Sequence, residues 1–160
     1  MYTQPYYRRW DVLVNNHYGQ PTLIVEVKSK INTSSEWVAK LRRNILAHGI
    51  LPSVPYFLIV FPDKFYLWIN NSEVNQLEVK EPDYIVSASS IIQPYYEQSG
   101  IKANQITEKS LEIIVVSWLE ELINAPKLTE KDLEQDHKWL IDSGLYDALV
   151  GGKINYEAVM

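Results

Sequence analysis

Two short aliphatic runs separated by a polar turn constrain the fold of this chain more than any other feature. The first run covers residues 10–14, the second covers residues 22–28, and the connection between them contains Asn, Gly and Pro. Apolar runs of this length, bounded by turn-forming residues, are typical of a β-hairpin. The sequence therefore predicts two adjacent strands near the start of the chain.

The second run carries two charged residues within an otherwise apolar strand. Side chains alternate between the two faces of a strand, so Ile24, Glu26 and Lys28 share one face. A buried charge is costly unless it is paired or binds a metal. Asp11, at the start of the neighbouring strand, is the expected further partner. The three polar residues predict an acidic pocket with an amine beside it, where the two strands meet.

An aspartate at the start of one strand, Asp11, is thus followed by Glu26-Val27-Lys28 on the next strand. This pattern resembles the PD-(D/E)XK nuclease superfamily, the fold of restriction endonucleases and many repair nucleases. With the helix sequence that follows, the chain looks most like a group of mainly cyanobacterial proteins assigned to that fold. The resemblance covers residues 8–70. It implies an α/β fold with a restriction-endonuclease-like mixed β-sheet flanked by helices, and with extra C-terminal helices.

The resemblance also implies a function, which is hydrolysis of phosphodiester bonds in DNA or RNA. Asp11, Glu26 and Lys28 are the implied catalytic residues, and Lys28 would orient or activate the attacking water. Asp11, Glu26 and the backbone carbonyl of Val27 would bind Mg²⁺, with Mn²⁺ as an alternative. Carboxylate and carbonyl oxygens are the ligands that Mg²⁺ prefers.

Two alternatives to this interpretation stay open. A catalytically inactive scaffold on the same fold could bind a partner protein or nucleic acid, because sites on a fold can decay. Alternatively, Glu26 and Lys28 could form an ordinary ion pair on an exposed strand.

A helix is predicted over residues 36–48. Apolar residues recur there with the spacing of one helical face. These residues are Trp37, Val38, Leu41, Ile45 and Leu46. The short connection before the helix predicts that it lies beside the Glu26 and Lys28 edge and leads into a parallel strand at 56–61.

Basic residues near this helix are candidates for binding substrate phosphates. Lys40 and Arg43 form part of a polar stripe next to the apolar face, and Lys30 follows the second strand. Simple solvation of a basic helix face is the alternative for each of them.

The chain is predicted to form a single domain, residues 1–160. A PD-(D/E)XK-like core at 8–70 is followed by a mainly helical C-terminal elaboration at 71–160. The elements expected beyond the helix are strands at 56–61, 65–69 and 154–157 and helices at 108–124, after Thr129 and at 145–150. Thr107 is the expected N-cap of the helix that begins at Glu108.

Charge is distributed unevenly along the chain. The net charge is −5, which argues against a protein that coats nucleic acid indiscriminately. Residues 1–64, however, contain eight Lys and Arg against four Asp and Glu, whereas residues 65–160 contain seven against sixteen. A polyanion could be attracted to the basic half, and two ordinary solvated surfaces are the alternative.

Several other classes of site find no support. The chain has no Cys, which excludes disulfides, thiolate metal sites and a cysteine nucleophile, and its three His show no metal-ligand spacing. No membrane-spanning run or signal peptide is present, so the expected location is cytoplasmic. The expected partner is nucleic acid, and no association with a membrane is expected. A homodimer is the arrangement expected if two copies pair to cut both strands.

Overall fold

A six-stranded mixed sheet forms the centre of the computed structural model, which describes residues 10–48, 51–69, 78–97, 100–125 and 137–155. The strand order is β5-β4-β3-β2-β1-β6, with β2 and β3 parallel and the other neighbours antiparallel. The strands are β1 (Val12–Asn15), β2 (Pro21–Val27), β3 (Tyr56–Val60), β4 (Lys64–Ile69), β5 (Tyr84–Ser87) and β6 (Lys153–Asn155). The predicted α/β class is therefore confirmed.

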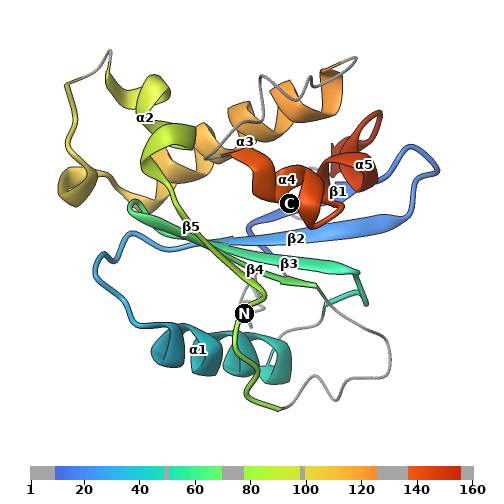
Figure 1. Cartoon of the computed structure of the whole chain (residues 1–160), viewed down its shortest axis with the longest axis horizontal. Coiled ribbons are helices and arrows are strands. Elements are labelled where there is room, and N and C mark those ends of the chain that lie inside the picture. The colour runs from blue at the N-terminus through green and yellow to red at the C-terminus, as the bar shows by residue number, and fades with distance from the viewer. Residues whose placement is uncertain (1–9, 49–50, 70–77, 98–99, 126–136, 156–160) are drawn as a thin grey trace, which may run out of the picture.

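Helices cover both faces of the sheet. They are α1 (Ser35–His48), α2 (Ser89–Tyr96), the 3₁₀ turn η2 (Ala103–Gln105), α3 (Glu108–Asn124), α4 (Lys138–Asp142) and α5 (Leu145–Leu149). Figure 1 shows α1 alone on one side of the sheet and α2 to α5 together on the other. Each side has its own group of buried apolar side chains, one beneath α1 and a larger one beneath α3, α4 and α5.

The predicted hairpin is present, with its turn held by local hydrogen bonds. The Asn16 carboxamide oxygen accepts hydrogen bonds from the backbone amides of Tyr18 and Gln20, both at 3.0 Å. Gly19 has a φ of +82°, a conformation that favours glycine. Because β1 begins at Val12, Asp11 lies just before the strand rather than within it.

The predicted connection from β2 through α1 to a parallel β3 is also present. Val38 is fully buried against the sheet, and Leu41, Ile45 and Leu46 are packed against the same group. The exposed fractions of two residues of α1 do not follow from the sequence pattern. Trp37 is 40% exposed, and Arg42 is only 1% exposed.

The position of the helix relative to the sheet explains both differences. Trp37 lies in the first turn of α1, where its ring contacts Phe61 beyond the end of β3. Arg42 lies on the sheet-facing side, and its guanidinium carbon is 5.5 Å from the centroid of the Trp68 ring. Burial lowers the pKa of Arg42, and the negative charge of Asp83 acts in the opposite direction.

The second half of the chain adds strands to the edges of the sheet, and its helices cover one face of it. β5 and β6 are the two edge strands, and both come from residues beyond 71. The segment expected to be mainly helical therefore adds a strand at each edge. Residues 156–157 of the predicted last strand, and most of the helix predicted after Thr129, lie outside the described residues.

Helix α3 begins and ends where the sequence predicts. The Thr107 hydroxyl accepts a hydrogen bond from the Ser110 amide at 3.1 Å, which is an N-cap. Leu111, Val115 and Leu119 are fully buried on its sheet-facing side. None of the helices in the described ranges combines the length and apolar character that crossing a bilayer requires.

Candidate active site at the end of β2

Asp11 is tied directly to the end of β2. Its Oδ2 atom accepts a hydrogen bond from the backbone amide of Val27 at 2.7 Å. The antiparallel register pairs Val12 with Val25, and one more step along it brings Asp11 opposite Glu26. Directly opposite residues of an antiparallel pair have neighbouring side chains on the same face. The structure thus brings the Asp11 side chain to the backbone of Val27, the residue next to Glu26.

Glu26 is buried, with an exposed fraction of 8%. It lies on the face of the sheet that α1 covers, between Ile24 along its own strand and Ile59 on β3. A carboxylate in this setting does not fit the alternative in which Glu26 belongs to an ion pair on an exposed strand.

Lys28 continues the face on which Glu26 lies. Its backbone amide donates a hydrogen bond to the Val60 carbonyl at 2.9 Å, which extends the parallel ladder beyond β2. The register of β2 and β3, continued by this bond, brings Lys28 beside Phe61. The lysine is half-buried, and no ion pair joins it to a carboxylate of the described residues.

The loop after Lys28 is held against the turn between β3 and β4. The Asn32 amide donates to Oδ2 of Asp63 at 3.0 Å, and Asn32 has a φ of 58°. Deeper in the structure, the Tyr66 hydroxyl donates to the Thr33 carbonyl at 3.1 Å. These bonds fix the course of the segment that carries Lys30.

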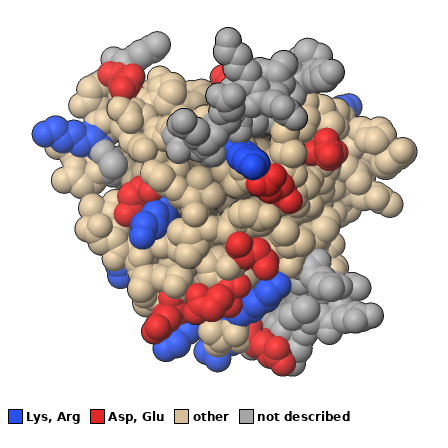
Figure 2. All heavy atoms as spheres, viewed as in Figure 1, with Lys and Arg blue, Asp and Glu red and all other residues tan. Residues whose placement is uncertain are grey.

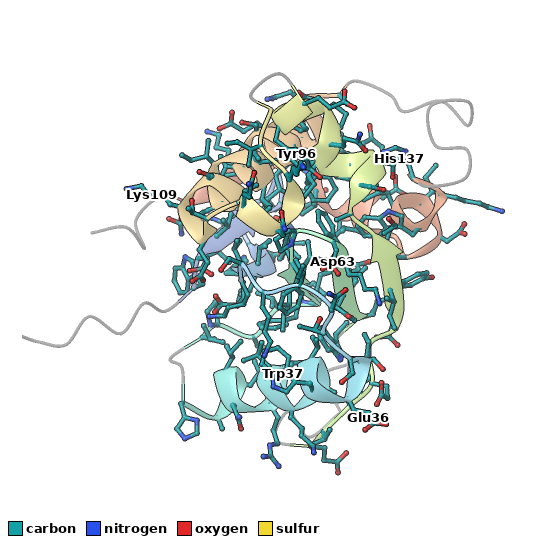
Figure 3. The ribbon with its side chains drawn as sticks, turned by 90° about the vertical axis from the view of Figure 1, so that its left-hand side faces the viewer. Glu36, Trp37, Asp63, Tyr96, Lys109 and His137 are labelled. Atoms are coloured by element: carbon teal, nitrogen blue, oxygen red, sulfur yellow. The ribbon has the colours of Figure 1, made fainter. Side chains whose placement is uncertain are left out.

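Asp63 lies in the turn between β3 and β4, close to the loop that follows Lys28. It is not among the candidate site residues that the sequence indicates. Its Oδ1 atom is buried and has no hydrogen-bond partner within the described ranges. Figure 3 shows Asp63 above Trp37, which lies on the sheet-facing side of α1. The one sequence signal for Asp63 is the Pro62-Asp63-Lys64 turn, a pattern common to many hairpins.

The three candidate phosphate-binding residues are placed differently. The Lys30 ammonium lies 4.5 Å from the centroid of the Trp37 ring, at the same end of the sheet as Lys28. Lys40 and Arg43 are exposed on the side of α1 opposite its buried residues. The structure therefore groups Lys30 with Lys28 and leaves Lys40 and Arg43 on the outer surface of the helix.

The available ligands are compatible with Mg²⁺. The described residues contain no group of three or more His, Cys, Asp and Glu that could hold a metal. The resemblance to PD-(D/E)XK nucleases implies Asp11 and Glu26 as the carboxylate ligands. The N–H and C=O groups of one strand residue point to the same side, and the Val27 N–H points to Asp11. The Val27 carbonyl therefore also faces Asp11. Two carboxylates and one carbonyl suit Mg²⁺, which usually keeps several waters.

The surface charge of the molecule is mixed. On the face drawn in Figure 2, acidic and basic side chains are interspersed, with no broad surface of one sign. Any attraction of a polyanion on this face would therefore be local.

Comparison with protein-family models, curated proteins and solved structures gave no match to this chain. The resemblance to PD-(D/E)XK nucleases therefore rests on the residues themselves and stays a prediction.

Proposed function

We propose that this protein is a metal-dependent nuclease that hydrolyses phosphodiester bonds of DNA or RNA at Asp11, Glu26 and Lys28. The observation that carries the proposal is the 2.7 Å hydrogen bond from the Val27 amide to Asp11. This bond joins the first acid of the motif to the segment that holds the other two residues. The parallel β2 and β3, joined through α1, are compatible with the restriction-endonuclease-like arrangement that the proposal requires.

Each residue has a role that follows from its chemistry. Asp11, Glu26 and the Val27 carbonyl would hold Mg²⁺ or Mn²⁺. The bound ion would supply a water of lowered pKa and neutralise charge on the phosphate. Lys28 would donate hydrogen bonds to the attacking water or to a phosphate oxygen, and its positive charge would stabilise the charge that develops there.

The position of Lys28 supports this role. It is half-buried and lies two residues along the strand from the buried Glu26, so its side chain extends from the same face of the sheet toward the end where Asp11 lies. A phosphate is the natural ligand for a lysine placed in this way beside two acids that can share a divalent cation.

Cleavage assays with matched variants test the proposal. Labelled single-stranded and duplex DNA and RNA are incubated with the purified protein in Mg²⁺, in Mn²⁺ or in EDTA. We expect cleavage only with a divalent ion, and a loss of about 100-fold or more in Glu26→Gln and in Lys28→Met. Lys109→Met is the control, because Lys109 is an exposed lysine on α3 (Figure 3).

Cleavage that persists in a folded Glu26→Gln or Lys28→Met variant would remove that residue from the mechanism. If the native protein bound nucleic acid but cut none of the substrates with either ion, the catalytically inactive scaffold would replace the nuclease as the function.

A further inference from the structure

Trp37 differs from the other tryptophans of the chain in its exposure. It is 40% exposed, whereas Trp10, Trp68, Trp118 and Trp139 are each 8% exposed or less. The start of α1 fixes its position, because the Trp37 amide donates to the Ser34 hydroxyl at 3.2 Å. Trp37 is thus a large aromatic ring held at the surface by a rigid element.

The ring lies next to the candidate active site. Its centroid is 6.3 Å from that of Phe61, the residue that the β2 and β3 register brings beside Lys28. The Lys30 ammonium lies 4.5 Å from the Trp37 centroid. Lys30 follows Lys28 by two residues, so the aromatic ring and both lysines belong to one end of the sheet.

We propose that Trp37 stacks against an unpaired base of the substrate while Lys30 moves from the ring to the adjacent phosphate. We call Trp37 and Lys30 together the stacking platform. The proposal deepens the nuclease function and rests on it, because it makes single-stranded nucleic acid, or a duplex with an unpaired end, the substrate class.

A base can replace the Lys30 ammonium on the Trp37 ring, because stacking of a base is the stronger of the two interactions. An exposed cation–π contact changes an equilibrium by a factor of about two to five. Stacking of a base on an aromatic side chain contributes a factor of about five to more than a hundred. The displaced ammonium gains a phosphate as its new partner. The contact between Lys30 and Trp37 therefore does not prevent base binding.

The substrate class follows from what stacking requires. A base inside a duplex is stacked on both sides and must be unpaired before it can contact a protein ring. Bases of a single strand, and frayed bases at a duplex end, are available at lower cost. The platform should therefore distinguish these substrates from an intact duplex without reading a particular sequence.

Tryptophan fluorescence measures this binding directly, because four of the five tryptophans are buried. The full-length protein is titrated in EDTA, which separates binding from cleavage. The probes are a single-stranded oligothymidylate, an abasic oligomer of equal length and a relaxed circular duplex, which has no ends to fray. We expect the oligothymidylate to quench the share of the emission that Trp37 contributes, and the abasic oligomer and the duplex to quench little of it. Equal quenching by the abasic oligomer would overturn the proposal.

Variants of the platform give the second measurement. Trp37→Ala should weaken oligothymidylate binding about tenfold, and Trp37→Phe should weaken it less, because phenylalanine still offers a ring. Lys30→Met should reduce the slope of log affinity against log salt by about 0.7, the value for one phosphate contact on a single strand. Tyr18→Ala is the matched control, since Tyr18 is a 77% exposed aromatic residue at the opposite end of the same hairpin.

Failure of the platform and failure of the nuclease proposal are distinguishable. Unchanged oligothymidylate affinity in Trp37→Ala would overturn the platform even if Glu26→Gln abolished cleavage. Affinity that depends on Trp37, in a protein that cuts nothing with Mg²⁺ or Mn²⁺, would support the platform and exclude the nuclease.

Discussion

The guanidinium group of Arg42 lies over the ring of Trp68, with 5.5 Å between the guanidinium carbon and the ring centroid. All three of its side-chain nitrogens are buried, and none has a hydrogen-bond partner among the described residues. Removing a charge from water costs several kcal/mol, whereas a desolvated cation–π contact returns only about 2 kcal/mol. The aromatic contact therefore offsets only part of the desolvation penalty.

We expect Arg42→Met to raise the free energy of unfolding by about 1–3 kcal/mol, because methionine fills a similar space without a charge. Denaturation in guanidinium chloride measures this change. Arg43→Met on the exposed side of α1 is the control for stability and should change it by less than about 0.5 kcal/mol. A destabilised Arg42→Met would mean that Trp68 and the Asp83 charge together outweigh the desolvation of the guanidinium.

Asp11 allows the structural and catalytic roles of one carboxylate to be separated. Asn in place of Asp11 keeps an oxygen that can accept the Val27 amide but removes the charge. Asp11→Asn should therefore remain close to native stability and lose metal-dependent cleavage. Asp11→Ala loses the hydrogen bond as well and should be less stable by about 1–3 kcal/mol. Chemical denaturation and calorimetric Mg²⁺ titration of both variants test this, and Mg²⁺ binding by Asp11→Asn equal to the native protein would contradict a ligand role.

Gly152 lies where β6 begins to pair with β1. A β-carbon at this position would collide with the backbone carbonyl of Asn15 and come within 2.9 Å of the Leu149 oxygen. Gly152→Ala should therefore separate β6 from β1 and increase hydrogen exchange at Leu13 and Asn155, which are paired in the native register. Gly100→Ala is the control for backbone strain without a collision, because the φ of +73° at Gly100 disfavours alanine but a β-carbon there meets no atom within 4 Å. Unchanged exchange in Gly152→Ala would show that the two strands adjust without parting.

Tyr56 should make stability depend on alkaline pH. Its hydroxyl donates to the Ser143 carbonyl at 2.8 Å, and burial, with smaller effects of Asp147 and Tyr84, raises its pKa above the ordinary value of 10.0. The folded state therefore retains this proton to higher pH than the unfolded state does. The contribution is complete below about pH 10 and is lost as pH rises through the folded-state pKa.

Tyr56→Phe should accordingly lower stability by about 1 kcal/mol at pH 7 and show a shallower decline above pH 10 than the native protein. Urea denaturation across this pH range measures both effects. Parallel profiles for the two proteins above pH 10 would exclude Tyr56 as a contributor to the alkaline decline.

Sequence patterns predicted the helices and strands whose formation depends on residues close to them in the sequence. Thr107 as a cap was enough to locate the start of α3, and Leu111 is the first buried residue of that helix. The hairpin and the parallel crossover through α1 follow from similarly local signals, namely turn residues and a short connection. The same hairpin brings Asp11 to the end of β2, where it accepts the hydrogen bond from the Val27 amide.

Other features depend on contacts that a local pattern does not contain. The exposed Trp37 and the buried Arg42 reverse the usual preferences of their residue types, because the first turn of α1 passes beyond β3 while its middle faces Trp68. Likewise, Asp63 gains its contact with Asn32 only when two distant loops come together. Strand β5, with four residues, is too short for alternation to define its bounds before its partner is in place, whereas β6 overlaps the strand predicted at 154–157.

The pairing of β1 with β6 has a consequence for synthesis of the protein. Val14 leaves the ribosome long before its partner Ile154, because the two residues are far apart in the sequence. During most of translation the outer edge of β1 therefore has unpaired amide and carbonyl groups, which readily recruit a foreign strand. The hairpin that holds Asp11 thus has one unpaired edge until residues 153–155 have been synthesised.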